Sequence, residues 1–209
     1  MRRWEFRSDG AGCAGAPPRG QDTIARMAPI VSLRPVTDAD MPVLELIRAD
    51  PQEATRFGFF GFRTNNGMRR DFAENGLLAE NNGVLAVVAA GELVGSVSWH
   101  RVRTAPISFT WNIGISLLGS ARGRGYGTAA QRALAEYLFG YTEANRVEAG
   151  TETDNYAEQR ALEKAGFTRE GVARGAAFRA GRWRDMVIYA MVRADITDIE
   201  ERVEPPVAG

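Results

Sequence analysis

The chain has 209 residues, of which 44% are apolar and 25% are charged, a composition typical of one globular domain with flexible ends. Its 26 Lys and Arg residues equal its 26 Asp and Glu residues in number, so no overall field attracts nucleic acid or an anionic membrane. No run of the sequence approaches the roughly 18 uninterrupted apolar residues of a membrane helix. We therefore expect a cytoplasmic protein without nucleic acid or membrane partners.

Metal sites built from cysteine or histidine side chains are excluded by number. Cys13 is the only cysteine and His100 is the only histidine in the chain. One cysteine can form neither an internal disulfide nor a cysteine-based zinc site, and one histidine cannot form a histidine-rich centre. The sequence therefore predicts a reducing compartment and no metal cofactor.

Both ends of the chain lack the periodicity of a helix or a strand. Residues 1–28 are rich in Gly, Ala, Pro and Arg and contain no apolar stretch of the length that a secretory signal requires. Residues 195–209, with several glutamates and two prolines, have a similar lack of pattern. The sequence predicts an extension over 1–28, one folded domain over 29–194 and a flexible tail over 195–209.

The first predicted elements are a strand and a helix. Residues 30–35 alternate apolar and polar side chains, as a half-buried strand does. Thr37 can cap a helix that carries Met41, Leu44 and Ile47 on one face. The order of elements therefore begins with strand, then helix.

Residues 51–80 have a less regular pattern, in which a helix is predicted around residues 68–78. Four phenylalanines gather just before this helix, and such a cluster fits either a hydrophobic core or the wall of an acceptor pocket. The four are Phe57, Phe59, Phe60 and Phe62. The sequence leaves both interpretations open.

Residues 84–118 predict a three-stranded antiparallel meander. Residues 84–90 and 93–101 are apolar strands joined at a Gly91-Glu92 turn, and residues 109–118 supply the third strand. A glycine-rich loop and a helix through Tyr141 come next. These are followed by a strand over 146–152, a helix over 155–165 that Gly166 ends, and a long hairpin of strands 168–178 and 183–192. The sum is an α+β fold, with a mixed, mostly antiparallel sheet of about seven strands flanked by helices.

The glycine-rich loop over 117–128 is the most informative stretch. Gly123, Gly125 and Gly127 have no Cβ atoms, so a ligand can approach the backbone closely. The first amides of the following helix have no partners within that helix and lie at the positive end of its dipole. Together with Arg122 and Arg124, they favour a phosphate or pyrophosphate ligand.

Three phosphate-binding patterns can be compared with this loop. A P-loop needs a lysine before its Ser or Thr, and this loop contains no lysine. A dinucleotide fingerprint needs G-x-G-x-x-G, whereas the loop has G-x-G-x-G, although Glu152 lies near the end of the next strand, where a ribose-binding acid would be expected. The third pattern, R-x-x-G-x-G, is matched by Arg122, Gly125 and Gly127.

This loop and three further motifs, which follow one another along the chain in the order expected for the family, resemble the GNAT superfamily of acetyl-CoA-dependent N-acetyltransferases over residues 30–192. Within it, the chain is similar to the ribosomal-protein alanine acetyltransferases of the RimJ and RimL type. The further motifs are Trp111-Asn112-Ile113-Gly114-Ile115 before the loop, Asn155 at the start of the next helix, and Glu163-Lys164-Ala165-Gly166-Phe167 followed by Glu170-Gly171. The closing strand, Arg184-Asp185-Met186-Val187-Ile188-Tyr189, also has the style of the family.

The resemblance implies a GNAT fold whose sheet splays apart to admit the pantetheine arm of acetyl-CoA or another acyl-CoA. Backbone groups of Ile115 and Leu117 would pair with the arm as if it were another strand. Residues of the loop would hold the pyrophosphate, namely Arg122, Gly123, Arg124, Gly125, Tyr126, Gly127 and Thr128. Asn155 would hydrogen-bond the arm or a bridging water, or else serve as a simple helix N-cap.

The catalytic acid and base are not evident from the family pattern. Many relatives have a glutamate base in the strand before the loop, where this chain has Asn112, and a tyrosine acid where it has Leu162. Two candidates remain. His100 has an ordinary pKa near neutrality, although a lone histidine also fits a polar surface network. Glu158 lies one helical turn after Asn155 and could act through water, although it also fits a solvated helix charge.

The resemblance implies an acyltransferase that acts directly on a primary amine. The acceptor is either a protein N-terminus or a small molecule of biosynthesis or resistance, and the phenylalanines with the neutral overall charge favour a small or moderately apolar amine. The donor is free acyl-CoA, favoured by Arg122 and Arg124, or a pantetheine thioester on an acyl carrier protein. A non-catalytic CoA-binding protein is the third alternative, and a homodimer is compatible with all three.

Overall fold

The computed structural model describes residues 30–196. The predicted extension over 1–28 and most of the predicted tail over 195–209 lie outside the described residues. The bounds predicted for the folded domain, 29–194, therefore stay a prediction. Among residues 30–196, the structure contains no helix with the length and apolar character needed to cross a membrane.

The described residues form one eight-stranded sheet, in which seven strands follow the order β1-β3-β4-β5-β6-β8-β7 and a two-residue strand, β2, pairs with β3. Neighbouring strands are antiparallel except for β5 and β6, which run parallel. The bounds are β1 (Val31–Pro35), β2 (Leu78–Ala79), β3 (Asn82–Ala89), β4 (Glu92–Ala105), β5 (Ser108–Leu117), β6 (Arg146–Glu152), β7 (Thr168–Arg179) and β8 (Arg182–Val192). The mixed, mostly antiparallel sheet confirms the fold class predicted from the sequence.

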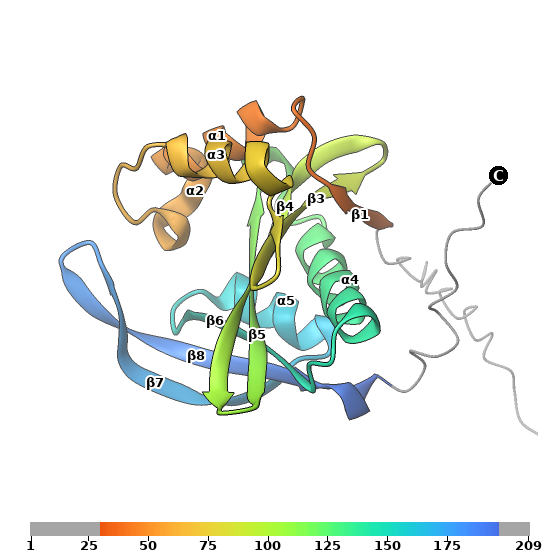
Figure 1. Cartoon of the computed structure of the whole chain (residues 1–209). Coiled ribbons are helices and arrows are strands. Elements are labelled where there is room, and N and C mark those ends of the chain that lie inside the picture. The colour runs from red at the N-terminus through yellow and green to blue at the C-terminus, as the bar shows by residue number, and fades with distance from the viewer. Residues whose placement is uncertain (1–29, 197–209) are drawn as a thin grey trace, which may run out of the picture.

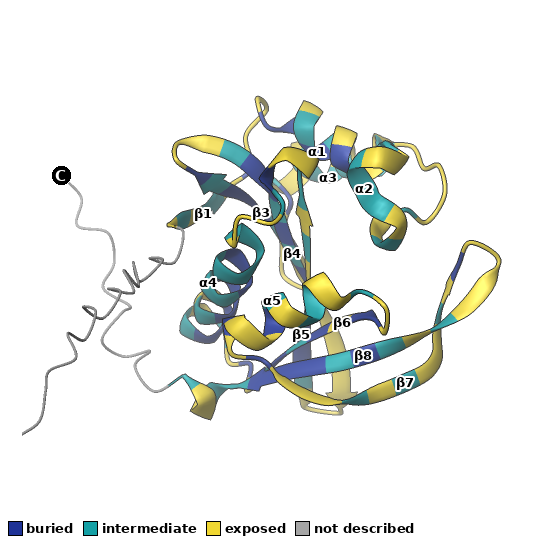
Figure 2. Ribbon diagram, turned by 180° about the vertical axis from the view of Figure 1, so that it is seen from behind, coloured by how far each residue is buried: buried dark blue, intermediate teal, exposed yellow. Residues whose placement is uncertain are grey.

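Five helices flank this sheet within the part of the chain that the structure describes (Figure 1). They are α1 (Met41–Ala49), α2 (Pro51–Gly58), α3 (Asn66–Asn75), α4 (Tyr126–Tyr141) and α5 (Tyr156–Ala165). The first three helices lie together on one side of the molecule, and the last two lie together on the other (Figures 1 and 2). The long hairpin of β7 and β8 projects past the other strands towards α2.

Two hydrophobic clusters on opposite faces of the sheet hold the helices in place. Alternation along β3 explains this division, because successive side chains of a strand point to opposite faces. Val87 packs with α4 in the larger cluster, whereas Ala86 packs with α1 in the smaller one. Dark blue, buried segments of the central strands accordingly lie beneath the helices in Figure 2.

The helix around Met41, Leu44 and Ile47 forms as predicted, and these three side chains are its buried residues. The predicted cap is wrong, because the residue before the helix is Asp40 and not Thr37. Thr37 instead donates hydrogen bonds from its amide and its hydroxyl to the Asp40 carboxylate, each at 2.8 Å. Asp40 also accepts two hydrogen bonds from Arg34, and this pairing holds the pKa of the Asp40 carboxyl well below its ordinary value.

Residues 51–80 differ most from the sequence-based expectation. The helix predicted around 68–78 begins at Asn66 and ends at Asn75, since Gly76 adopts a left-handed conformation at its C-terminal end. Helix α2 has no counterpart in the prediction. The phenylalanine cluster does not form a core, because none of its four members is buried and Phe62 is 85% exposed.

The sheet divides where β5 meets β6. These strands pair at three positions only, which are Trp111 with Val147, Asn112 with Glu148, and Ile113 with Ala149. Beyond them, β5 continues to Leu117 and β6 to Glu152 without pairing to each other. The loop that follows β5 and the helix that follows β6 therefore begin on opposite sides of a gap in the sheet.

Candidate active site

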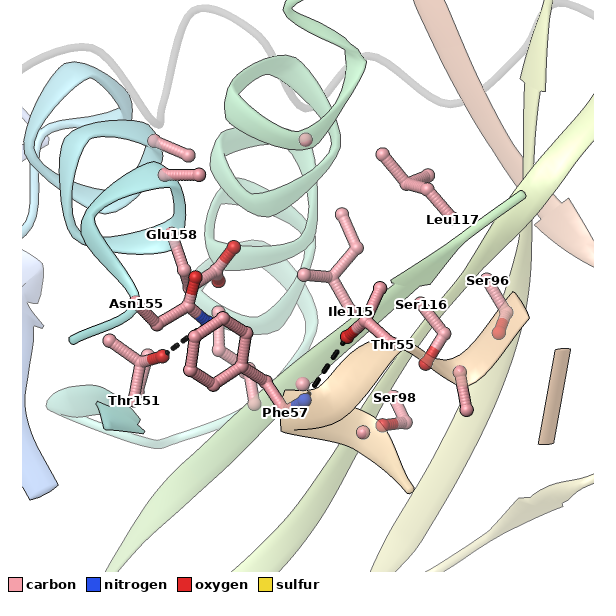
Figure 3. A pocket seen from close by; sticks show the side chains of 18 of the residues that line it. Thr55, Phe57, Ser96, Ser98, Ile115, Ser116, Leu117, Thr151, Asn155 and Glu158 are labelled. Atoms are coloured by element: carbon pink, nitrogen blue, oxygen red, sulfur yellow. Dashed lines mark hydrogen bonds between the residues drawn. The ribbon is translucent and has the colours of Figure 1, made fainter. Parts of the chain in front are cut away.

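The gap between β5 and β6 opens into one continuous cavity of about 1120 Å³. Its walls come from the glycine-rich loop, the splayed ends of the two strands, α5, and the α1–α2 region on the far side (Figure 3). Eight of the ten cofactor residues predicted from the sequence line it, as do both catalytic candidates. The eight are Ile115, Leu117, Arg122, Gly123, Gly125, Gly127, Thr128 and Asn155.

The backbone of the loop leaves room for a ligand. Gly123 and Gly125 have φ angles of 72° and 84°, a left-handed conformation that glycine adopts without steric cost. A Cβ atom added to Gly123 would meet no atom within 4 Å, so open space lies beside it. Helix α4 starts directly after Gly125, and its first turn closes where the Ala129 amide donates to the Gly125 carbonyl at 3.2 Å. The amides before Ala129 have no acceptor within the helix and can bind an anion.

Arg122 lines the cavity, but its guanidinium is already engaged. Its Nε donates to the Leu117 carbonyl at 3.0 Å, and its Nη2 donates to the same carbonyl at 2.7 Å and to the backbone carbonyl of Glu53. The Glu53 carboxylate in turn accepts a hydrogen bond from the Gly119 amide at 2.7 Å. Arg122 and Glu53 therefore tie the loop to α2, and the phosphate contact predicted for Arg122 would require rearrangement.

The other two cofactor candidates lie beside the cavity rather than on its wall. Arg124 is exposed in the loop and has no hydrogen bond or ion pair to any described residue. Tyr126, the first residue of α4, is half-buried and packs against the larger hydrophobic cluster. Arg124 thus remains free to meet an anion, whereas the Tyr126 side chain has a packing role.

Asn155 precedes α5 but does not cap it with its side chain. Its Nδ2 instead donates to the Thr151 hydroxyl at 2.8 Å across the turn that joins β6 to the helix. Both residues line the gap, and their hydrogen bond is the dashed line at the left of Figure 3. The simple N-cap interpretation is therefore wrong for the side chain, which faces the cavity.

Two carboxylates on the cavity wall have opposite environments. Glu152 is buried and accepts two hydrogen bonds of 2.5 Å from Arg179, which is also buried. This pairing leaves Glu152 no role as the ribose-binding acid of a dinucleotide site. Glu158 has no hydrogen-bond or ion-pair partner among residues 30–196, and burial raises the pKa of its carboxyl from 4.5 to about 7.

Sequence reasoning missed the contribution of α2 and of the floor beneath it. Ser96 and Ser98 of β4 face Ser116 and Gly114 of β5 in directly paired positions, and all four line the cavity. Their alternation along the strands was a usable signal, because residues two apart share one face. Thr55 and Phe57 of α2 also reach the cavity, but no local pattern indicates this (Figure 3).

Comparison with known proteins identifies the family. A model described as an acetyltransferase (GNAT) domain matches residues 31–168. The chain belongs to the GNAT acetyltransferase family. It is 34% identical over 103 residues to a Bacillus subtilis (strain 168) protein named Probable N-acetyltransferase YjcK. That match covers 49% of this GNAT chain and 56% of YjcK, so the chain spans little more than half of its relative.

Solved structures share the GNAT fold of this chain. Mycobacterium smegmatis RimJ in complex with CoA-disulfide superposes with a TM-score of 0.65 at 23% identity, over 81% of this chain and 85% of RimJ. Spermidine N-acetyltransferase from Vibrio cholerae, in complex with CoA and spermine, superposes with a TM-score of 0.69 at 15% identity. The superposition covers 79% of this chain and 96% of the Vibrio cholerae enzyme. At these identities the likeness concerns the fold.

Positions that carry acid and base in many GNAT proteins cannot do so here. Asn112 lines the cavity in β5, directly opposite His100 of β4, but an amide cannot accept a proton at neutral pH. Leu162 is apolar and lies on the buried face of α5, in the larger hydrophobic cluster. Tyr156, a further hydroxyl nearby in sequence, is 66% exposed and does not line the cavity. His100, at the exposed rim, and Glu158, within the gap, therefore remain the two candidates for proton transfer.

Proposed function

We propose that this protein transfers an acetyl group from acetyl-CoA to a primary amine by direct attack of the amine on the thioester. The observation that carries the proposal is the continuity of one cavity from the glycine-rich loop into the gap between β5 and β6. A loop that binds an anion lies at one end, and an unpaired strand edge leads away from it. This arrangement fits a donor that has a pyrophosphate followed by an extended amide-bearing arm.

The donor is held by backbone groups more than by arginines. Amides from Gly123 through Thr128 bind the pyrophosphate, with the positive end of α4 behind them. The arm lies along Ile115 and Leu117 in the gap, and Asn155 hydrogen-bonds it from the opposite side. Free CoA is favoured over a carrier protein because Arg124, Arg160 and Lys164 have no ion-pair partners among residues 30–196 and suit nucleotide phosphates.

Acetyl-CoA supplies an activated acyl carbonyl, and the protein must manage protons. An aliphatic amine is largely protonated at neutral pH and cannot attack until it loses a proton. Glu158 is suited to this task because its pKa of about 7 allows it both to accept and to return a proton near neutrality. It takes one proton from the incoming ammonium and gives it to the leaving thiolate. The second proton of the reacting nitrogen leaves to solvent, with His100 at the rim as the group that passes it on.

The acceptor is an amine with a single positive charge and a neutral, partly apolar body. Leu44, Ile47 and Met68 line the acceptor side above the serine floor. Of the three acids on the cavity wall, Glu53 is bound to the loop and Glu152 to Arg179, which leaves Glu158 alone uncommitted among the described residues. A polyamine would require several free carboxylates. A small monoamine or a protein N-terminus meets these conditions.

Incubation of the full chain with acetyl-CoA and an amine panel tests the proposal. The panel contains apolar primary amines, peptides that begin with Ala or Ser, and spermidine. Mass spectrometry should detect the amide product of a monoamine or peptide, together with an equal release of free thiol. If CoA binds while amide and thiol both stay at background with every amine, the protein is a non-catalytic CoA-binding protein and the proposal fails. Spermidine as the best acceptor would refute the proposed acceptor class.

A further inference from the structure

Phe57 is held across the gap in the sheet by a strained segment of α2. The helix is interrupted at Thr55, which has a φ angle of 61° and a ψ angle of 170°. A β-branched residue rarely adopts a positive φ, and such strain persists only where surrounding contacts impose it. The Thr55 hydroxyl accepts a hydrogen bond from the Phe57 amide at 3.2 Å, which fixes the turn that directs the ring into the cavity (Figure 3).

The first contact across the gap runs from α2 to the start of α5. Arg56 donates to the Asp154 carboxylate at 3.0 Å, although 98 residues separate the two in sequence. Its guanidinium carbon lies 4.5 Å from the centre of the Phe57 ring, within the range of a cation–π contact. Because Asp154 directly precedes Asn155, this contact holds the Phe57 ring close to the side chain proposed to bind the pantetheine arm.

The second contact runs from α2 to the end of β6. The guanidinium of Arg179, on β7, lies 5.6 Å from the Phe57 ring and is fixed by its paired hydrogen bonds to Glu152. Glu152 directly follows Thr151, the hydrogen-bond partner of Asn155. Phe57 therefore contacts two guanidinium groups, each anchored next to the Thr151–Asn155 pair.

We propose that Phe57 limits the length of the acyl group that this protein transfers. The inference rests on the proposed function, which puts the pantetheine arm in the gap beside Asn155. The loop leads into α4, which packs on the face of the sheet opposite α1. An arm that runs from the loop through the gap therefore carries its acyl carbons towards the other face, where the Phe57 ring of α2 lines the cavity. An acetyl group ends before this ring. A longer chain must displace the ring and break its contacts with Arg56 and Arg179.

The test compares donors of increasing acyl length with one fixed amine acceptor. The relative kcat/KM for acetyl-CoA, butyryl-CoA and hexanoyl-CoA is measured for the parent, Phe57→Ala and Phe57→Leu. The control is Phe59→Ala, since Phe59 packs edge-to-face against Phe62, at 5.3 Å between ring centres, and does not line the cavity. We expect Phe57→Ala to raise the hexanoyl-to-acetyl ratio at least tenfold, Phe57→Leu to raise it less, and Phe59→Ala to leave it unchanged.

The inference and the proposed function fail in different ways. An unchanged hexanoyl-to-acetyl ratio in a folded Phe57→Ala variant overturns the role of Phe57. So does a variant that changes the preferred amine but not the acyl ratio, because Phe57 would then form the acceptor wall. A parent protein that transfers no acyl group refutes the proposed function instead. In that case, calorimetric titration of hexanoyl-CoA and acetyl-CoA into the same variants measures the ratio of the two donor affinities, which does not require turnover.

Discussion

Gly125 sits directly before α4 with a φ angle of 84°. We predict that Gly125→Val abolishes measurable binding of acetyl-CoA while the far-ultraviolet circular dichroism spectrum stays close to that of the parent. A β-branched side chain in this conformation costs about 1 to 3 kcal/mol and shifts the amides that face the ligand. Calorimetric titration of acetyl-CoA measures the loss.

Gly76→Val is the matched control for this backbone strain. Gly76 also has a positive φ, 65°, and ends α3 outside the cavity wall. This variant should lose stability but keep its affinity for acetyl-CoA. If Gly125→Val folded and bound the donor as well as the parent does, the loop would not be the donor site, and every role assigned to it would have to be withdrawn.

Glu158 allows a prediction about activity as a function of pH. If its carboxylate accepts the proton of the amine, turnover should rise as the pH increases through about 7, the raised pKa of the group. Glu158→Gln should lower kcat by about 10²-fold and remove this rise, with little change in the affinity for acetyl-CoA. Glu143→Gln, at an exposed position outside the cavity, is the control. A Glu158→Gln enzyme with the parent pH profile would exclude Glu158 from proton transfer.

The same raised pKa predicts how stability changes with pH. The native state holds the Glu158 proton up to about pH 7, whereas the unfolded chain releases it near the ordinary value of 4.5. The native state therefore binds more protons between these values, and the free energy of unfolding should fall as the pH rises from about 4.5 to 7. Urea titrations across this range should show a smaller fall for Glu158→Gln. An equal fall in both proteins would mean that other groups cause it.

At the scale of elements, α2 explains most of what the sequence did not predict. Its eight residues contain no buried side chain, a non-helical Thr55 and only one large apolar side chain, that of Phe57, so the segment is too short and too polar for its apolar residues to predict a helix. Contacts with distant parts of the chain hold it, notably those of Glu53 with the loop and of Arg56 with Asp154. Such contacts leave no local pattern. Elements with periodic buried faces, including α1, α4 and the central strands, were predictable for the opposite reason.

The contact between α2 and the loop separates the roles of two arginines that look equivalent in sequence. Arg122→Ala should lower both the affinity for acetyl-CoA and the free energy of unfolding, the latter by about 1 to 3 kcal/mol, because it leaves the half-buried Leu117 and Glu53 carbonyls without their donor. Arg124→Ala should weaken donor binding alone, since Arg124 is exposed. Calorimetric titration combined with urea unfolding distinguishes the two. Equal stability losses in the two variants would contradict this division.

At the scale of the whole molecule, the order of strands and helices after residue 84 was predictable because each element has its own apolar period and each break has its own turn residue. The position of the loop between a strand and a helix then indicated an anion site. The cavity itself was not predictable, because it needs β6, α5 and α2 to meet the loop from sequence positions far away. The raised pKa of Glu158 was not predictable for the same reason, since its burial depends on all of these neighbours.

Donor binding should stabilise the entire described fold. A ligand that binds only the native state, present at 100 times its Kd, adds about 2.7 kcal/mol. For a domain of this size, that corresponds to a rise in Tm of roughly 5 to 10 °C. Thermal unfolding with CoA, acetyl-CoA and NAD measures it. CoA and acetyl-CoA should give the rise and NAD should not, and the opposite result would contradict the donor assignment.

The three-residue pairing of β5 with β6 makes a narrow neck between two half-sheets, one ending at β1 and the other at β7. Because only these three pairs join the two strands, we expect the unpaired ends of β5 and β6 to move relative to each other in the free protein. A donor arm in the gap would contact both strand ends and restrict their relative motion. The conformational entropy lost in restricting this motion then offsets part of the favourable free energy of donor binding. Substitutions that stiffen the neck would therefore tighten donor binding without touching the donor.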